Sequence, residues 1–168
     1  MTTLYLVRHG ETKDNVAMMM QGQRQGELTA NGVKQMEALR HRLKDVHFDA
    51  IVSSDLRRAK DSAEIVALHR GLTVMTTPLL RERDWGDFTG RFIPDLKDLP
   101  MPDNVEKMGA LLDRARAFLD WLKAEYPGKT VLAVGHGITN KAIQAVYYGK
   151  LTREIPRMDN AECRVLSL

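Results

Sequence analysis

The sequence predicts an α/β protein whose mostly parallel central sheet is covered by helices on both faces. Two observations lead to this prediction. Short, continuous apolar runs alternate along the chain with longer stretches of helical period. Continuous apolar runs are typical of strands buried on both faces, as parallel strands are in α/β proteins. The length of 168 residues fits one domain, and 43% hydrophobic residues are enough for one packed core.

The first part of the chain carries two strands and two helices in alternation. Residues 4–7 form a short buried strand, and residues 29–46 form a helix, because Thr29 suits the N-cap and the apolar side chains repeat along one stripe. A second strand follows at residues 50–52. A second helix covers residues 56–70, with Gly71 placed to serve as its C′ residue. The stripe of the first helix consists of Val33, Met36, Leu39, Leu43 and Val46.

The second part begins with a third strand at residues 72–75, which stops before Pro78. An irregular stretch follows, from residue 79 to about residue 102. The longest helix spans residues 103–126, because eight apolar side chains fall on its inner face and a Pro-Gly pair ends it. The remaining predicted elements are a strand at residues 131–134, a helix at 138–148 and a closing strand at 163–168.

Composition and charge exclude several classes of protein. Lys and Arg total 25 against 22 for Asp and Glu, so the net charge is only +3. This mild excess favours a few arginines in an anion pocket over a nucleic-acid surface. The single cysteine, Cys163, excludes an internal disulfide and a multi-thiolate metal site. No apolar run approaches the ~18 residues of a membrane span. The start of the sequence carries no secretory pattern, so we expect a cytoplasmic protein with neither membrane nor nucleic-acid partners.

Polar clusters follow four of the predicted strands. They lie at residues 8–12, 53–58, 81–84 and 135–137. Ligands of open α/β sheets bind at the carboxyl ends of the strands, so parallel strands would bring all four clusters to one rim. Each cluster alone has an ordinary structural explanation, such as a solvated helix arginine or a tight Gly-His-Gly turn. Their joint occurrence at successive strand ends favours a functional site.

The residues gathered at this rim suit a phosphomonoester. Guanidinium groups donate paired hydrogen bonds to phosphate oxygens. A neutral imidazole can attack phosphorus, and a carboxylic acid can protonate the leaving oxygen. Glycines beside the histidines would let the phosphate approach the backbone closely. The sequence therefore predicts a phosphoryl-transfer site built from histidine, arginine and a carboxylate.

Other motifs fit less well. The segment 128–130, Gly-Lys-Thr, is not a P-loop, because Lys123 stands where its first glycine should be and the strand follows the motif. Cys163 lacks the downstream loop of a cysteine phosphatase and is expected to pack inside a strand. His47 and Asp49 lie away from the rim, so we expect no metal site. Met18–Met20 are expected to fill an irregular gap rather than to line a substrate entrance.

Residues 8–12, Arg-His-Gly-Glu-Thr, resemble the RHG signature of the histidine phosphatase superfamily, also called phosphoglycerate mutase-like. Further similar segments follow in order from residue 4 to residue 168. The resemblance implies a three-layer α/β/α sandwich with one domain over residues 1–168 and a short irregular lid around residues 83–102. The similar segments are Leu28-Thr29, Gly32, Gln35, residues 53–59, Leu80–Glu82, Trp85-Gly86, Gly135–Gly137 and Asn160-Ala161.

The resemblance also implies roles for individual residues. It makes His9 the nucleophile and Glu82 the proton donor. Arg8, Arg58 and a protonated His136 would surround the phosphoryl group. Arg58 is preferred over its neighbour because the arginine of the family pattern immediately precedes the alanine.

Two more residues complete the implied site. Asn15 and Gly137 are expected to bind the phosphate as well. Because side-chain cations compensate the charge of the phosphate, no metal and no other cofactor is expected. Nearby guanidinium charge should lower the pKa of His9 and keep its imidazole neutral.

The function that the resemblance implies is a phosphatase that releases inorganic phosphate from a small phosphorylated metabolite. Only residues 91–102 separate the Trp-Gly loop from the long helix, and so short a lid should leave a phosphoenzyme open to water. A cofactor-dependent phosphoglycerate mutase and a non-catalytic binder of phosphate ligands are the alternatives. Gln25, Thr89 and Ile138 depart from the family pattern, and these differences bear on substrate identity rather than on the chemistry.

Overall fold

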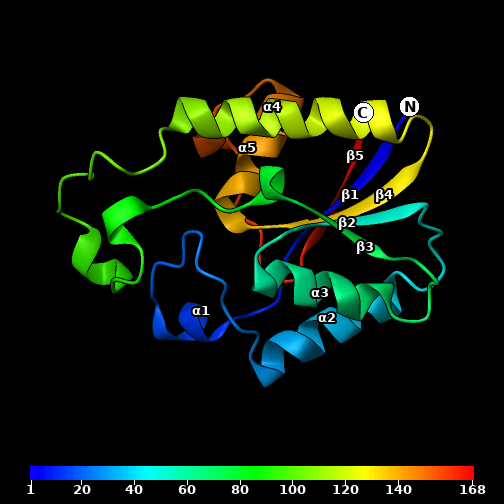
Figure 1. Ribbon diagram of the computed structural model, residues 1–168, viewed down its shortest axis with the longest axis horizontal. Coiled ribbons are helices and arrows are strands. Elements are labelled where there is room, and N and C mark those ends of the chain that lie inside the picture. Colours follow the sequence, from blue (N-terminus) through cyan, green and yellow to red (C-terminus); the bar gives the residue numbers. More distant parts are fainter.

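A computed structural model describes all 168 residues and contains one five-stranded sheet in the order β3-β2-β4-β1-β5 (Figure 1). The strands β1 to β4 are parallel to their neighbours, and only β5 is antiparallel, pairing with β1 at one edge. The predicted α/β class with a mostly parallel sheet is therefore confirmed. The strands are β1 (Thr3–Arg8), β2 (Ala50–Ser54), β3 (Val74–Thr77), β4 (Thr130–Gly135) and β5 (Cys163–Ser167).

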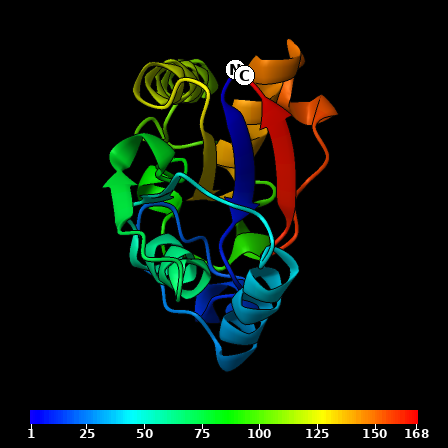
Figure 2. The same ribbon diagram turned by 90° about the vertical axis from the view of Figure 1, so that its right-hand side faces the viewer.

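Helices cover both faces of the sheet, which gives three layers; in Figure 2 the yellow-green and orange helices lie at the top and the teal and light-blue helices lie at the bottom. One layer holds α2 and α3, and the other holds α4 and α5. Short 3₁₀ turns occupy residues 78–80, 86–88, 93–96 and 152–154. The helices are α1 (Lys13–Ala17), α2 (Ala30–Arg42), α3 (Arg57–Ala67), α4 (Met108–Glu125) and α5 (Gly137–Tyr148).

The central strands are continuous apolar runs because each contributes side chains to two cores, one on either face of the sheet. In β4, Val131 and Ala133 belong to the core under α4 and α5, while Leu132 and Val134 belong to the core over α2 and α3. All four side chains are fully buried. Alternate residues of a strand point to opposite faces, so a strand between two helical layers must be apolar at every position.

Two helices end earlier than predicted. The helix expected to reach Val46 ends at Arg42, and the helix expected to reach Arg70 ends at Ala67, so Gly71 is not its C′ residue. Arg70 explains both ends, because its guanidinium donates to the carbonyl oxygens of Leu43 (2.6 Å), Val46 (2.7 Å) and Val66 (3.2 Å). These bonds satisfy carbonyls that a longer helix would have used.

Two further boundaries were also predicted wrongly. The longest helix begins at Met108 rather than at residue 103, because Glu106 turns inward to pair with Arg114. The third strand begins at Val74, two residues later than expected. No helix in the structure combines the length and the apolar character that crossing a membrane requires.

The sheet brings the ends of three strands together. Arg8 at the end of β1 lies opposite Gly135 at the end of β4, and Ser53 of β2 lies opposite Val134. The residues that follow these strands therefore share the edge of the sheet that is formed by the carboxyl ends of its parallel strands, as predicted. In Figure 1 this edge faces α1 and the lid segment, residues 83–102, drawn in green. The segment 18–20 is joined to the lid segment by backbone hydrogen bonds, including Met20 N–H to the Arg91 oxygen at 2.8 Å.

Candidate active site

A cavity of about 250 Å³ opens at this edge of the sheet. Six of the seven residues singled out in the sequence line it, namely Arg8, His9, Asn15, Arg58, Glu82 and Gly137. The seventh, His136, lies behind His9, with 5.1 Å between the two ring centroids. The predicted convergence of four separate segments on one rim is thus confirmed. A larger hollow of about 620 Å³ between the ends of α2 and α3 contains none of these residues.

His9 is held as a buried, neutral imidazole. It follows β1, its side chain lines the cavity, and the residue is only 2% exposed. The Nδ1 atom lies 2.7 Å from the carbonyl oxygen of Gly10, which can only accept, so Nδ1 carries the proton. Nε2 therefore keeps its lone pair. Burial lowers the pKa of His9 well below its usual value, and the charges of Arg58 and Arg8 lower it further.

Gly10 serves helix packing rather than phosphate approach. A Cβ at this position would lie 2.6 Å from the carbonyl oxygen of Gly32 in α2. The backbone N–H of Gly10 donates to Ser62 Oγ on α3 at 3.0 Å. The expectation that this glycine admits the phosphate is therefore corrected, because the close neighbour is the backbone of α2.

His136 is fully buried at the start of α5. Its Nε2 atom lies 2.9 Å from Ser54 Oγ, while its Nδ1 atom is buried without any partner in the protein. Burial lowers the pKa of His136 well below its usual value, followed by the effects of Arg58, His9 and Arg8. In the free protein His136 is therefore neutral, because burial and two nearby guanidinium groups oppose its protonation, and a protonated His136 around a bound phosphoryl group stays a prediction.

The two site arginines are buried, and in each of them one buried nitrogen has no hydrogen-bond partner. Arg8 donates from Nη1 to the Met158 oxygen at 2.8 Å, and Arg58 donates from Nη2 to the Gly22 oxygen at 2.7 Å. The Nε atoms of both residues are buried without partners. Burial lowers the pKa of Arg58 to about 10. Its neighbour Arg57 points outward and pairs with Asp61, so the choice between the two arginines agrees with their placement.

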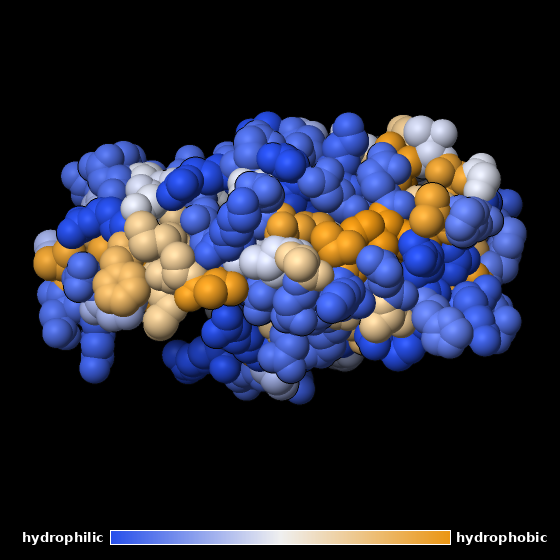
Figure 3. Space-filling view, turned by 90° about the horizontal axis from the view of Figure 1, so that it is seen from below, coloured by the Kyte–Doolittle hydropathy of each residue, from blue (hydrophilic) through white to orange (hydrophobic).

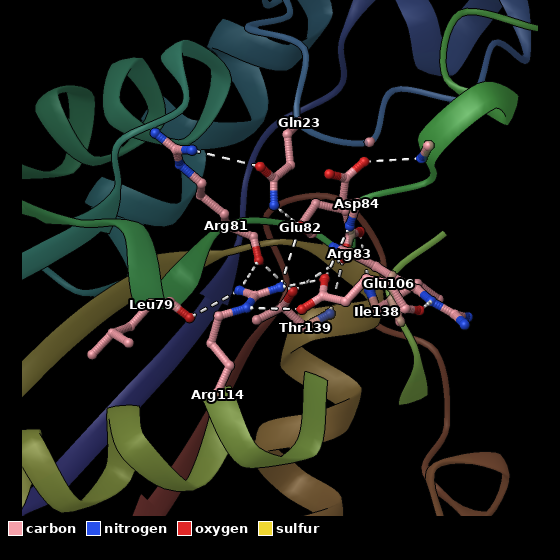
Figure 4. Close-up of polar contacts among 12 residues, drawn as sticks. Gln23, Leu79, Arg81, Glu82, Arg83, Asp84, Glu106, Arg114, Ile138 and Thr139 are labelled. Atoms are coloured by element: carbon pink, nitrogen blue, oxygen red, sulfur yellow. Dashed lines mark hydrogen bonds and ion pairs between the residues drawn. The ribbon is translucent and has the colours of Figure 1, made fainter. Parts of the chain in front are cut away.

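Glu82 lies against the N-terminus of α5. Its Oε1 atom accepts from the backbone N–H of Thr139 (3.0 Å) and of Arg83 (2.9 Å), and its Oε2 atom accepts only from the N–H of Ile138 (3.1 Å). Figure 4 shows this carboxylate beside α5, at the end of residues 79–82, which we call the acid loop. Helix N-termini stabilise anions through free N–H groups. Oε2 is the less engaged oxygen of the two.

Arg114 was not predicted, yet it holds the loop that carries Glu82 (Figure 4). Its Nη1 atom donates to the carbonyl oxygens of Leu79 (3.1 Å) and Arg81 (2.5 Å), and it is paired with Glu106 at 2.8 Å. In the sequence Arg114 reads as a solvated helix residue. The one feature of the sequence that could have indicated a buried contact is the position of Arg114, three residues after Leu111 at the border of the apolar stripe of α4.

The outer wall of the cavity carries an amide and several apolar side chains. Asn15 accepts at Oδ1 from the backbone of Thr12, and its Nδ2 atom donates no hydrogen bond within the protein. Met19, Met20 and Trp85 also line the cavity. Their placement corrects the gap-filling interpretation of the methionine run, because the segment 18–20 pairs with the lid segment at the cavity mouth.

Further apolar side chains are exposed on α1, on the residue that follows it and on the lid segment. Seen from below, they gather at the end of the molecule where α1 and the lid segment lie (Figure 3). The exposed hydrophobic residues that these two segments contribute include Val16, Met18, Phe92 and Ile93. Of these four residues, Ile93 lines the cavity, so its lining combines apolar and cationic side chains.

The remaining candidates lie outside the cavity. No group of three His, Cys, Asp or Glu side chains is arranged to hold a metal ion. His47 and Asp49 lie 3.4 Å apart at the surface. Cys163 packs in β5 beside the second core, and burial raises the pKa of its thiol to about 11.

The helices on both faces of the sheet and the two buried histidines beside two arginines agree with the fold and the site that the sequence predicts. The model of the histidine phosphatase superfamily (branch 1) matches residues 4–168, and the chain belongs to this family. It is 36% identical to the uncharacterized phosphatase PhoE of Bacillus subtilis over 85% of this chain and 76% of that protein. It is 38% identical to a probable phosphoglycerate mutase, GpmB, of Proteus mirabilis, over 82% and 71% of the two chains.

A solved structure is also similar over nearly the whole chain. It is a mycobacterial glucosyl-3-phosphoglycerate phosphatase in complex with VO3, with 31% identity and a TM-score of 0.91. The alignment covers 98% of this chain and 92% of that one. The relatives thus include proteins named as phosphatases and proteins named as probable phosphoglycerate mutases.

Proposed function

We propose that the protein is a phosphomonoesterase that hydrolyses a small phosphorylated metabolite through a phosphohistidine formed on His9. One observation carries the proposal. The free Nε2 atom of a neutral, buried His9 faces a cavity whose surroundings keep three buried nitrogens without partners. These nitrogens are Arg8 Nε, Arg58 Nε and His136 Nδ1. Buried donors without partners are rare, and phosphate oxygens would satisfy all three.

In the first step, the Nε2 lone pair of His9 attacks phosphorus. The N–P bond forms while the bond between phosphorus and the leaving oxygen breaks, and the leaving oxygen takes a proton from Glu82. Oε2 is the suitable atom of Glu82 because it accepts only one hydrogen bond in the protein. Arg8 and Arg58 stabilise the charge that spreads over the three other phosphoryl oxygens.

His136 supports this step as a neutral donor. Ser54 Oγ accepts a hydrogen bond from the backbone N–H of Leu56, so its own proton is available for His136 Nε2. The ring proton of His136 then resides on Nδ1, which has no partner in the protein. A phosphoryl oxygen can accept from this N–H without any prior protonation of the ring.

In the second step, a water molecule attacks the phosphorus of the phosphohistidine. Glu82 takes the proton from the water, the P–N bond breaks, and its electron pair returns to His9 Nε2. Inorganic phosphate leaves, and both residues regain their starting protonation states. The side chains of Arg8 and Arg58 supply the charge compensation, so the proposed scheme uses no metal ion and no other cofactor.

Transfer to water is favoured over transfer back to a sugar acid by the shortness of the lid segment. Its 3₁₀ turn at Ile93–Leu96 is followed by only eleven residues before α4 begins at Met108. The likeness to the Proteus mirabilis protein keeps a phosphoglycerate mutase as the second candidate.

The two candidates differ in their products. Phosphate release from p-nitrophenyl phosphate and from 3-phosphoglycerate should be followed beside isomerisation of 3-phosphoglycerate, with and without bisphosphoglycerate. We expect phosphate release from both compounds and no isomerisation. Isomerisation without net phosphate release would identify a mutase. Binding of phosphate esters without either reaction would identify a non-catalytic binder.

A further inference from the structure

We infer that Lys141 and Arg157 form a second anion-binding subsite in this cavity, which selects phosphomonoesters that carry another anionic group. The inference rests on the proposed function and specifies its substrate class. The second group is a carboxylate or a second phosphate, since both present anionic oxygens to cationic donors.

Both side chains belong to the wall of the cavity, beyond the residues assigned to the phosphoryl group. Lys141 follows Gly137 by one turn of α5, so the two lie on the same helix face. Helical side chains lean toward the N-terminus of their helix, which directs Lys141 toward the phosphoryl site.

Arg157 approaches from the segment before β5. It is the neighbour of Met158, whose carbonyl oxygen holds Arg8 Nη1 at 2.8 Å. Its charge is close enough to lower the pKa of Arg8, although burial has the larger effect on that guanidinium. Arg157 and Lys141 therefore reach the cavity from different elements.

Neither cation has an anionic partner in the protein. No carboxylate lies within 4.0 Å of either one, and neither side chain donates a hydrogen bond. Other cations around the acid loop are engaged, since Arg81 pairs with Asp55 at 2.7 Å and Arg114 pairs with Glu106. Two acids lie near this wall. Glu162 pairs with Arg164 at 2.6 Å, and Asp159 is exposed and pairs with neither Lys141 nor Arg157. Lys141 and Arg157 are thus available to a ligand.

The charge of the cavity exceeds what one phosphate can balance. Four cationic side chains and one carboxylate line it, and both site histidines are neutral. A phosphate dianion leaves one positive charge, or two when Glu82 holds its proton. A second anionic group on the same ligand would neutralise this remainder.

The apolar side chains that line the cavity and its size limit the body of the ligand. Met19, Met20, Trp85 and Ile93 are apolar, so they suit a short carbon chain between two anionic ends. The volume of about 250 Å³ lies below the range of about 300–1,000 Å³ that is usual for drug-sized ligands. A compound of a few carbon atoms fits this space.

The test compares 3-phosphoglycerate with glycerol 3-phosphate, which differ by a carboxylate in place of a hydroxymethyl group. Glycerol 1,3-bisphosphate forms a third arm, in which a phosphorylated hydroxymethyl group stands in place of the carboxylate. The kcat/KM ratio of each anionic compound to glycerol 3-phosphate should be measured for Lys141→Gln, Arg157→Gln and the double variant. Lys150→Gln and Arg153→Gln are matched controls, because both side chains are exposed and lie outside the cavity.

We expect wild type to prefer one anionic compound over glycerol 3-phosphate by at least about tenfold, equivalent to about 1.4 kcal/mol. The preferred compound identifies the second group as a carboxylate or a phosphate. The double variant should bring that ratio close to one, while the two controls should leave it unchanged. A wild-type ratio near one for both anionic compounds, or a ratio that the double variant preserves, would overturn the inference.

Failure of the proposed function has a different outcome, namely no turnover of any ester, p-nitrophenyl phosphate included. Calorimetric binding of 3-phosphoglycerate, glycerol 3-phosphate and the bisphosphate to the same proteins then tests the subsite without turnover. The expected result is the same preference in binding constants and its loss in the double variant. Equal affinity of wild type for all three compounds would count against the subsite.

Discussion

Arg114 and Glu106 form a two-point ion pair directly behind the loop that carries Glu82. Nη2 of Arg114 lies 2.8 Å from Oε1 of Glu106, and its Nε lies 3.2 Å from Oε2. The side chains are only 17% and 15% exposed. Because the same guanidinium also donates to the Leu79 and Arg81 carbonyl oxygens, the pair fixes the acid loop on α4.

Replacement of Arg114 should therefore impair catalysis, although the side chain of Arg114 does not line the cavity. Arg114→Ala removes several hydrogen bonds that involve a charged group, each worth about 1.5–3 kcal/mol. We expect kcat to fall at least about tenfold, because about 1.4 kcal/mol of barrier is a tenfold change in rate. Urea unfolding should show a loss of about 2 kcal/mol or more.

Arg116→Ala is the matched control, because Arg116 lies on the same helix with a side chain 56% exposed. Its exposed pair with Asp113 should contribute less than about 1 kcal/mol. Equal behaviour of the two variants in kcat would refute a positioning role for Arg114.

Glu82→Gln should discriminate between leaving groups. The amide keeps the size of the side chain but is too weak an acid to transfer a proton to the leaving oxygen, so alkyl phosphates should lose about 10²–10⁴-fold in kcat/KM. p-Nitrophenyl phosphate should lose much less, because its leaving group departs readily as an anion. The measurement is kcat/KM for both esters with wild type and variant. Equal losses on the two esters would show that Glu82 is not the proton donor.

The neutral histidines predict a specific dependence of stability on pH. Burial lowers the pKa of His9 and of His136 in the folded protein, whereas both regain values of about 6.5 on unfolding. Between the two values the unfolded chain binds more protons than the folded one, so stability must fall as the pH falls below about 6.5. The slope contributed by the two residues approaches about 2.7 kcal/mol per pH unit.

Urea titrations between pH 5 and pH 8 measure this slope. The variant His9→Asn/His136→Asn should lose the contribution of the two imidazoles while keeping the contributions of all other groups. An unchanged slope in the double variant would mean that folding does not lower the pKa of either histidine.

Gly10→Ala should destabilise the fold, because the new Cβ would lie 2.6 Å from the Gly32 carbonyl oxygen. The Cβ is fixed to the backbone and its neighbour is a backbone oxygen, so α2 and the segment after β1 must separate, at a cost of about 1–3 kcal/mol. Gly109→Ala in α4 is the matched control, since its Cβ meets no atom within 4 Å. That change should stabilise the helix by up to about 1 kcal/mol. The measurement is urea unfolding, and equal effects would refute the packing role of Gly10.

The sequence predicts the types of the main elements well, because the two-layer core imposes a local pattern. The alternation of Val131 and Leu132 between the two cores makes β4 apolar throughout, and periodicity detects this directly. Helix ends are predicted less well, because they depend on distant partners. Arg70 ends α2 by contacts 24 and 27 residues away along the chain, which no local pattern contains.

The features of the candidate site also fall into two groups, those that a local pattern predicts and those that depend on distant partners. His9, Arg58 and Glu82 could be predicted because each follows a strand, and the ends of parallel strands meet. The protonation state of His136 could not, since it depends on burial beside two arginines. Arg114 and Thr139 were missed because their roles come from contacts with the acid loop rather than from position in a motif.

The central claim concerns the bond between His9 and phosphorus, and rapid quench tests it most directly. Wild type and His9→Ala should be mixed with ³²P-labelled p-nitrophenyl phosphate and quenched within milliseconds. We predict that wild type yields a labelled protein that is stable in base and labile in acid, and that His9→Ala yields none and has lost turnover. Normal turnover by His9→Ala, or a label on the variant equal to that on wild type, would contradict the account.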